Sequence, residues 1–236
     1  MTKLMPIADL DAFVTTRNSW HSLAEHVLTK ARHSHTERIG LRPHAGGFAT
    51  PHFGDDRRVF VDASGIHLEQ FGDVASVPFT TLSAAAAFIG IEAGAPVDVF
   101  APSTPCDLDA RLTVDDQSMH ILGDWFAFGG EALRQLRAAH ADDNPSLVQL
   151  WPEHFDLAVD FGDVNDRTRA NYGASPGDGA IPKPYLYVGP WEMTDKTDDP
   201  FWNQPWGTAL AYDALCAAPD PLGAAASFFA HAATRL

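Results

Sequence analysis

The residues best suited to chemistry in this chain lie in its C-terminal third, in the segment 153–161. From Phe155 to Phe161 every second residue is apolar, which predicts a strand over residues 155–161 with one face in the core. His154, Asp156 and Asp160 would then project from the opposite face, where successive side chains are about 7 Å apart. This spacing suits a catalytic histidine–carboxylate pair, or two ligands of a metal ion. A plain amphipathic strand with its polar face in water accounts for the same pattern, because half-solvated antiparallel sheets are common.

A turn follows this strand in the sequence Ser175-Pro176-Gly177-Asp178. Proline and glycine at the two central positions are typical of a type II turn, and the flanking serine and aspartate can hydrogen-bond the backbone. Two interpretations stay open. The segment is simply a well-formed turn, or it holds Asp178 rigidly at the mouth of a pocket.

Aromatic residues gather just beyond this turn. Tyr187 lies on a strand predicted at 185–189, and Trp191 and Trp206 follow beside prolines and glycines. Rings in such loops line pockets for flat or apolar small molecules, and they also form exposed patches that dock a partner. If the pocket exists, Tyr187, Trp191 and Trp206 would be its walls, with Asp178 and Glu192 at its edge.

The elements that must position these residues follow from periodicity. Helical spacing runs from Leu10 to about Ala31, with Asp9 as the predicted N-cap. Short strands separated by turn residues fill 38–79 and precede an alanine-rich helix capped at Thr80 or Thr81. The second half repeats this order: a helix over 115–140, strands within 148–212 and a final helix over 222–234. Two glycines, Gly129-Gly130, are expected to permit a close helix contact or a kink.

This order predicts an α+β protein, with mostly antiparallel sheet flanked by helices. The halves would be two pseudo-equivalent helix–meander–helix units, although two unrelated lobes would give the same pattern. We expect residues 1–236 to form a single compact domain, or two lobes, 1–112 and 113–236, with the candidate site in the second.

The composition of the chain disfavours several classes of binding partner and of site. The chain has 31 acidic and 16 basic residues and a formal charge of −15, which disfavours nucleic acid and anionic membranes. Two cysteines are too few for a disulfide framework or a thiolate zinc site. The longest apolar run, Leu82 to Ile91, is too short to span a bilayer, and the start of the chain has no signal-peptide pattern. A soluble, cytoplasmic protein is expected.

Histidines are frequent in the first quarter of the chain. A His-x3-His pair is absent, and the comparable pair four residues apart is His21 with Glu25. We therefore expect these histidines to be solvated or to cap turns, not to bind metal. The set comprises His21, His26, His33, His35, His44 and His52.

Three motifs in order resemble a family of bacterial proteins known only as a domain of unknown function. They are Trp-Pro-Glu-His-Phe-Asp-Leu-Ala at 151–158, Ser-Pro-Gly-Asp at 175–178 and Pro-Tyr-Leu-Tyr-Val-Gly-Pro-Trp at 184–191. The resemblance covers mainly residues 147–212. That family has no assigned activity, so the resemblance implies no reaction.

Two hypotheses of function follow. The first is a small-molecule pocket on the C-terminal sheet, in a hydrolase or isomerase that uses His154 with a carboxylate, with or without a divalent cation. The second is a non-catalytic module whose exposed aromatic residues dock a protein partner or a second copy of the chain.

Overall fold

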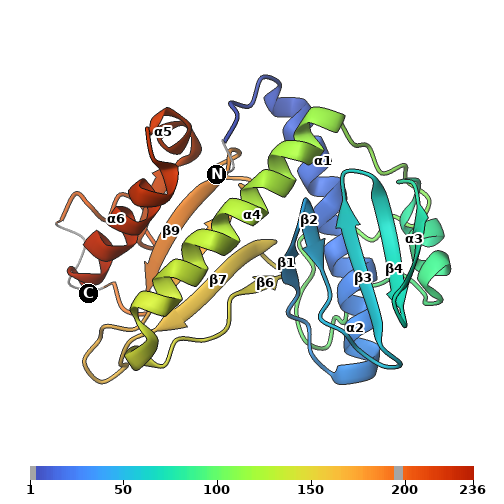
Figure 1. The fold of residues 1–236 in the computed structure, drawn as a ribbon, viewed down its shortest axis with the longest axis horizontal. Coiled ribbons are helices and arrows are strands. Elements are labelled where there is room, and N and C mark those ends of the chain that lie inside the picture. The colour runs from blue at the N-terminus through green and yellow to red at the C-terminus, as the bar shows by residue number, and fades with distance from the viewer. Residues whose placement is uncertain (1–3, 194–198) are drawn as a thin grey trace. The chain divides into compact units, whose positions relative to one another are not determined.

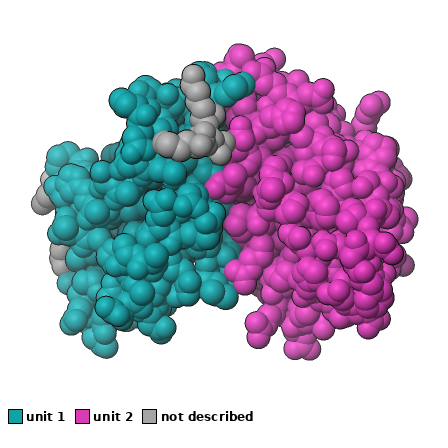
Figure 2. Space-filling model, viewed as in Figure 1, with its two compact units in different colours: residues 1–6, 128–149, 156–236 teal, residues 7–127, 150–155 magenta. Residues whose placement is uncertain are grey.

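The computed structural model describes residues 4–193 and 199–236 and confirms the α+β class. These residues form two five-stranded antiparallel sheets, each with its strands in chain order (Figure 1). The contacts divide the chain into two compact units (Figure 2). Unit 1 contains residues 1–6, 128–149 and 156–236, and unit 2 contains residues 7–127 and 150–155. The predicted lobes, 1–112 and 113–236, stay a prediction.

Unit 2 is a continuous helix followed by a five-stranded meander and a short helix. The helix begins after Asp9, whose Oδ1 accepts a hydrogen bond of 3.0 Å from the Ala12 N–H, and Thr81 caps the short helix in the same way. Both predicted N-caps are confirmed. The elements are α1 (Leu10–Leu23), the π-helical turn η1 (Ala24–Leu28), α2 (Thr29–Thr36), β1 (Arg42–His44), β2 (Gly47–Ala49), β3 (Arg57–Asp62), β4 (Gly65–Gln70), β5 (Asp73–Val77) and α3 (Leu82–Ile89).

The core of unit 2 lies between the continuous helix and one face of this sheet (Figure 1). Trp20 of α1 is fully buried, and its ring lies 5.8 Å from the ring of Phe48 on β2. Phe48 also contacts Phe126 and Phe155 edge to face, at 6.1 and 5.3 Å. Aromatic pairs in this geometry add to the stabilisation that burial gives. The helix is thereby fixed on the sheet.

Unit 1 has a second meander with helices. The long helix α4 (Asp116–Ala139) begins in unit 2 and ends in unit 1. The remaining elements are η2 (Ala141–Asp143), β6 (Gln149–Trp151), whose last two residues belong to unit 2, β7 (Asp156–Phe161), β8 (Ala170–Ser175), β9 (Tyr185–Pro190), β10 (Thr208–Ala211), α5 (Tyr212–Ala217) and α6 (Pro221–Ala233). Among the described residues no helix is long and apolar enough to cross a membrane.

One face of the unit 1 sheet is apolar and packs against helices. Tyr172 of β8 lies 6.0 Å from Phe229 of α6, measured between ring centroids. A Cβ added at Gly129 would lie 2.6 Å from the Cβ of Ala174, so α4 comes closer to β8 than any larger residue permits. The close contact predicted for the glycine pair is confirmed at Gly129. The opposite face of the sheet is left for polar and aromatic side chains.

The predicted strand over residues 155–161 begins one residue later than expected, and this displaces His154. Residues 152–155 form a turn, and Phe155 has a φ of 56°, in the left-handed region that a strand does not use. The alternation of faces that starts at Asp156 therefore does not extend back to His154. His154 is exposed in the turn. The prediction that His154, Asp156 and Asp160 share one strand face is wrong for His154.

Candidate functional site

Two tyrosine hydroxyl groups donate hydrogen bonds to two carboxylates on the polar face of the unit 1 sheet. Tyr187 of β9 donates to Oδ2 of Asp156, the first residue of β7. Tyr185, two residues earlier on the same face of β9, donates to Oδ2 of Asp178 over 2.6 Å. Asp156 is only 5% exposed, so its carboxylate depends on protein donors instead of water.

The turn after β8 holds Asp178 in place. Gly177 has a φ of 95°, close to the value that the third position of a type II turn requires. Oδ1 of Asp178 accepts the backbone N–H groups of Ala180 at 2.6 Å and Ile181 at 2.8 Å, while its Oδ2 faces Tyr185. The Asp178 N–H also donates to the Ile181 carbonyl oxygen at 2.8 Å, so the carboxylate is fixed by residues 178–181, which follow the predicted turn at 175–178.

Trp206 completes this group by packing against both tyrosine rings. Its ring centroid lies 6.1 Å from that of Tyr185 and 5.9 Å from that of Tyr187, the latter edge to face. Gly173 lies beside Tyr187, where an added Cβ would meet ring atoms at 2.3 Å. Trp206 is 40% exposed, so the group has one aromatic surface open to solvent. We call Asp156, Asp178, Tyr185, Tyr187 and Trp206 the tyrosine–carboxylate cluster.

Burial, together with the neighbouring carboxylates, keeps the tyrosines protonated. Burial first, and then the charge of Asp156 and its hydrogen bond, raise the pKa of Tyr187 well above its ordinary value. Burial and the hydrogen bond to Asp178 likewise raise the pKa of Tyr185. Both hydroxyl groups are therefore donors at neutral pH and neither is a general base. Chemically, the cluster combines neutral aromatic rings with one buried carboxylate, Asp156, and one exposed carboxylate, Asp178.

The other predicted residues of the sheet face form a separate polar group. Asp160 makes an ion pair with Arg169, and the Arg169 guanidinium lies 4.6 Å from the ring centroid of Trp191. Glu192 pairs with Arg167, with 2.7 Å between Oε2 and Nε. Trp191 is 57% exposed. Because each acid here has an arginine partner, this group has the chemistry of an ordinary solvated surface.

Neither the hollow found in unit 1 nor the arrangement of possible metal ligands supports the predicted site. An open hollow of about 550 Å³ in unit 1 is lined by residues 199, 200 and 202–205 and by Met193, and not by the tyrosine–carboxylate cluster. No three His, Cys, Asp or Glu side chains within the described ranges are arranged as metal ligands.

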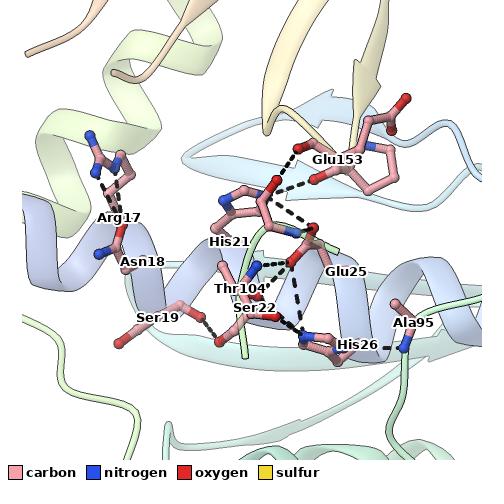
Figure 3. A network of polar contacts seen from close by, with 12 residues as sticks. Arg17, Asn18, Ser19, His21, Ser22, Glu25, His26, Ala95, Thr104 and Glu153 are labelled. Atoms are coloured by element: carbon pink, nitrogen blue, oxygen red, sulfur yellow. Dashed lines mark hydrogen bonds and ion pairs between the residues drawn. The ribbon is translucent and has the colours of Figure 1, made fainter. Parts of the chain in front are cut away.

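Unit 2 contains a buried polar network that the sequence did not indicate (Figure 3). Glu25, on η1, is fully buried. Its Oε1 accepts the Ser103 N–H at 2.6 Å and lies 3.6 Å from Nε2 of His21, and its Oε2 accepts the Thr104 N–H at 2.9 Å and the Thr104 hydroxyl. Burial alone raises the pKa of Glu25, but the hydrogen bonds from His21, Thr104 and Ser103 outweigh it, and the net pKa is lowered.

His26 extends this network on the same π-helical turn. The Ala95 N–H donates to Nδ1 over 3.1 Å, so the ring proton is on Nε2, which lies 3.0 Å from the Thr104 carbonyl oxygen. His21 is largely buried, stacks on Phe155 at 5.0 Å and contacts the Pro152 carbonyl oxygen at 2.7 Å. Each of these polar groups has a partner, so the network ties the helix to two loops.

The expectation that the early histidines are solvated or cap turns is wrong for His21 and His26. His35 and His52 are exposed, in agreement with it, and His33 is half-buried. His44 is half-buried against the ring of Phe60 at 4.5 Å and contacts the Arg58 guanidinium at 2.8 Å. The one sequence signal for the network is the spacing of His21 and Glu25, which share a helix face. The donors at residues 103–104 are 78 and 79 positions from Glu25 and leave no local pattern.

Comparison with known proteins adds no relative. No protein-family model, curated protein or solved structure matches this chain. The resemblance to the uncharacterised bacterial family therefore stays a prediction.

Proposed function

We propose that this protein binds a small organic cation at the tyrosine–carboxylate cluster. The observation that carries the proposal is the half-exposed Trp206 ring, which packs on two tyrosines whose hydroxyl groups are bonded to Asp156 and Asp178. A ligand can stack on the open indole while the carboxylates behind the tyrosines supply negative potential.

The electrostatics favour a cation over other small molecules. The face of an aromatic ring is negative, and an ammonium or guanidinium group over tryptophan gains about 0.5–2 kcal/mol. Two carboxylates behind the rings strengthen this attraction, and the net charge of −15 increases it at longer range. The same charges repel an anion. Because the tyrosines stay protonated and the carboxylates accept hydrogen bonds from their hydroxyl groups, the arrangement supports binding and supplies no general base.

The test is a titration followed by tryptophan fluorescence and by calorimetry. Choline, agmatine and benzylamine are the cationic probes, and glycerol and benzoate are the neutral and anionic comparisons. We expect saturable binding of at least one cation and none of benzoate. Trp206→Ala should weaken binding about tenfold, the equivalent of roughly 1.4 kcal/mol, which is within the range of one cation–π contact.

Trp191→Ala is the matched control, because Trp191 is also exposed but belongs to the arginine-paired group. It should leave cation binding unchanged. Equal losses in the two variants, or binding of benzoate as tight as that of the cations, would contradict the proposal.

A second candidate function rests on the two exposed indoles. Trp191 and Trp206 are 57% and 40% exposed, and tryptophan is enriched where proteins dock. On this alternative a second copy of the chain covers them. Sedimentation of the wild type and of the Trp191→Ala, Trp206→Ala double variant distinguishes the two functions. The docking function is favoured if the wild type is a dimer, the double variant is a monomer, and the wild type does not bind the cations.

A further inference from the structure

Arg32 of α2 is a buried cation whose charge nothing in the described structure balances. Arg32 is only 7% exposed, and its Nη1 atom is fully buried without a hydrogen-bond acceptor. No ion pair involves Arg32 in the described part of the chain. A guanidinium carries five N–H donors, and a buried charge without a partner is costly. Such a group is expected to have an acceptor in the working protein.

Thr29 supplies a second unsatisfied donor on the same side of α2. It precedes Arg32 by three residues, a spacing that places both side chains on one helix face. Thr29 is fully buried, and its Oγ1 also has no partner in the described residues. Threonines elsewhere in these helices bond the carbonyl four residues earlier: Thr16 to Ala12 and Thr36 to Arg32, both at 2.9 Å. The Thr29 hydroxyl makes no such hydrogen bond within the helix.

Two further arginines lie close to Arg32. Burial lowers the pKa of Arg32 most, and the charges of Arg42 and Arg38 lower it further, so each of these two guanidinium groups is near enough to repel that of Arg32. Arg38 is exposed and Arg42 on β1 is half-buried. A concentration of positive charge at one place is unusual in a chain of net charge −15. It would attract an anion toward Arg32.

We propose that Arg32 and Thr29 form a binding site for a small oxyanion, such as inorganic phosphate or the phosphate group of a metabolite. The Arg32 fork and the Thr29 hydroxyl would donate hydrogen bonds to the oxygens of the anion, and Arg38 and Arg42 would balance its remaining charge. Guanidinium groups recognise phosphate and carboxylate because the geometry of their N–H donors matches two oxygens at once. The site lies wholly within unit 2 and is independent of the cation site proposed above.

The test is calorimetric titration of the full chain with inorganic phosphate, with ³¹P NMR line broadening as a second readout. Sulfate and acetate are run in parallel, and chloride serves as the monatomic comparison. We expect one saturable phosphate site per chain. Arg32→Met should weaken phosphate binding at least about tenfold, since it removes a charge-assisted bidentate contact. Arg111→Met, the same change at an exposed arginine with no partner in the described residues, should leave it unchanged.

Two milder variants keep the test decisive if Arg32→Met does not fold. Arg32→Lys keeps the charge but loses the fork, and Thr29→Val keeps the shape but loses the hydroxyl. Each should weaken phosphate binding about threefold to tenfold. The proposal is overturned if phosphate, sulfate and acetate all fail to bind saturably, if chloride competes equally, or if the Arg32 variants bind phosphate as the wild type does.

Discussion

Both units bury a carboxylate. Side-chain donors reach both, and at Glu25 in unit 2 two backbone N–H groups are added to them. In unit 2, Glu25 accepts backbone N–H groups from Ser103 and Thr104, so its carboxylate holds a loop against the helix. In unit 1, Asp156 accepts a hydrogen bond from the side chain of Tyr187, whose ring contacts an exposed indole. Backbone donors commit a carboxylate to the architecture. At Asp156 the donor is a tyrosine whose ring packs against Trp206, and that indole is 40% exposed.

This contrast predicts that the largest loss of stability follows removal of Glu25. Glu25→Ala would leave buried N–H donors at residues 103 and 104 without an acceptor, and it should lower the free energy of unfolding by about 3–5 kcal/mol. Urea unfolding measures the loss. Glu92→Ala, at an exposed glutamate, is the control and should change stability by less than about 0.5 kcal/mol. A loss below about 1 kcal/mol for Glu25→Ala would show that the network does not hold the loop.

The pH dependence of stability is a second test of the contribution of Glu25. The pKa of Glu25 is lowered from its ordinary value of 4.5 in the folded protein. Its charge therefore stabilises the fold above about pH 4.5, and this contribution is lost as the pH falls through the lower folded pKa. In urea unfolding across this range, the difference in stability between wild type and Glu25→Gln should shrink as the pH falls. A difference that grows at low pH would mean that the pKa is raised instead.

The tyrosine–carboxylate pairs should show a smaller and graded effect. Tyr187→Phe removes a hydroxyl donor from a carboxylate that is 5% exposed, which should cost about 1–3 kcal/mol. Tyr185→Phe should cost less, about 1 kcal/mol, because Asp178 keeps the N–H groups of Ala180 and Ile181. Thermal unfolding of the two variants measures the order. A larger loss for Tyr185→Phe would reverse our ranking of the two pairs.

How far the sequence predicts this molecule depends on whether the determinant is local. The caps at Asp9 and Thr81 were predictable, because each depends on residue types within one turn of chain. The glycine pair in the helix indicated a close contact at Gly129, but not that its neighbour is Ala174, 45 positions later. His154 was misplaced because the positive φ of Phe155 interrupts the alternation, and a phenylalanine gives no sign of that conformation.

The contacts that define the candidate sites are long-range. Asp156 and Tyr187 are 31 positions apart, and Glu25 and Thr104 are 79 apart. The sequence predicted one pocket from Asp156, Asp178, Tyr187 and Trp206 together with His154, Asp160, Trp191 and Glu192. It did not indicate that the partner of each carboxylate is a tyrosine, because strand register determines that pairing. Arg32 begins the local basic cluster of the sequence, Arg32 to Arg42, which also carries Glu37 and is expected to be a solvated face. The structure buries Arg32 instead, and neither its missing partner nor that of Thr29 is visible in the sequence.

The smallest effect is expected at the ion pair between Asp160 and Arg169. Both side chains are partly exposed, 24% and 34%, so solvent screens the pair and its coupling should be about 0–1 kcal/mol. A double-mutant cycle with Asp160→Asn and Arg169→Met, followed by urea unfolding, isolates that coupling. The matching cycle at Asp156 and Tyr187 should give a larger coupling, because that pair is buried. Equal coupling energies would mean that burial does not strengthen the Asp156–Tyr187 pair over the Asp160–Arg169 pair. Asp160 would then be as good a candidate for the ligand site as Asp156.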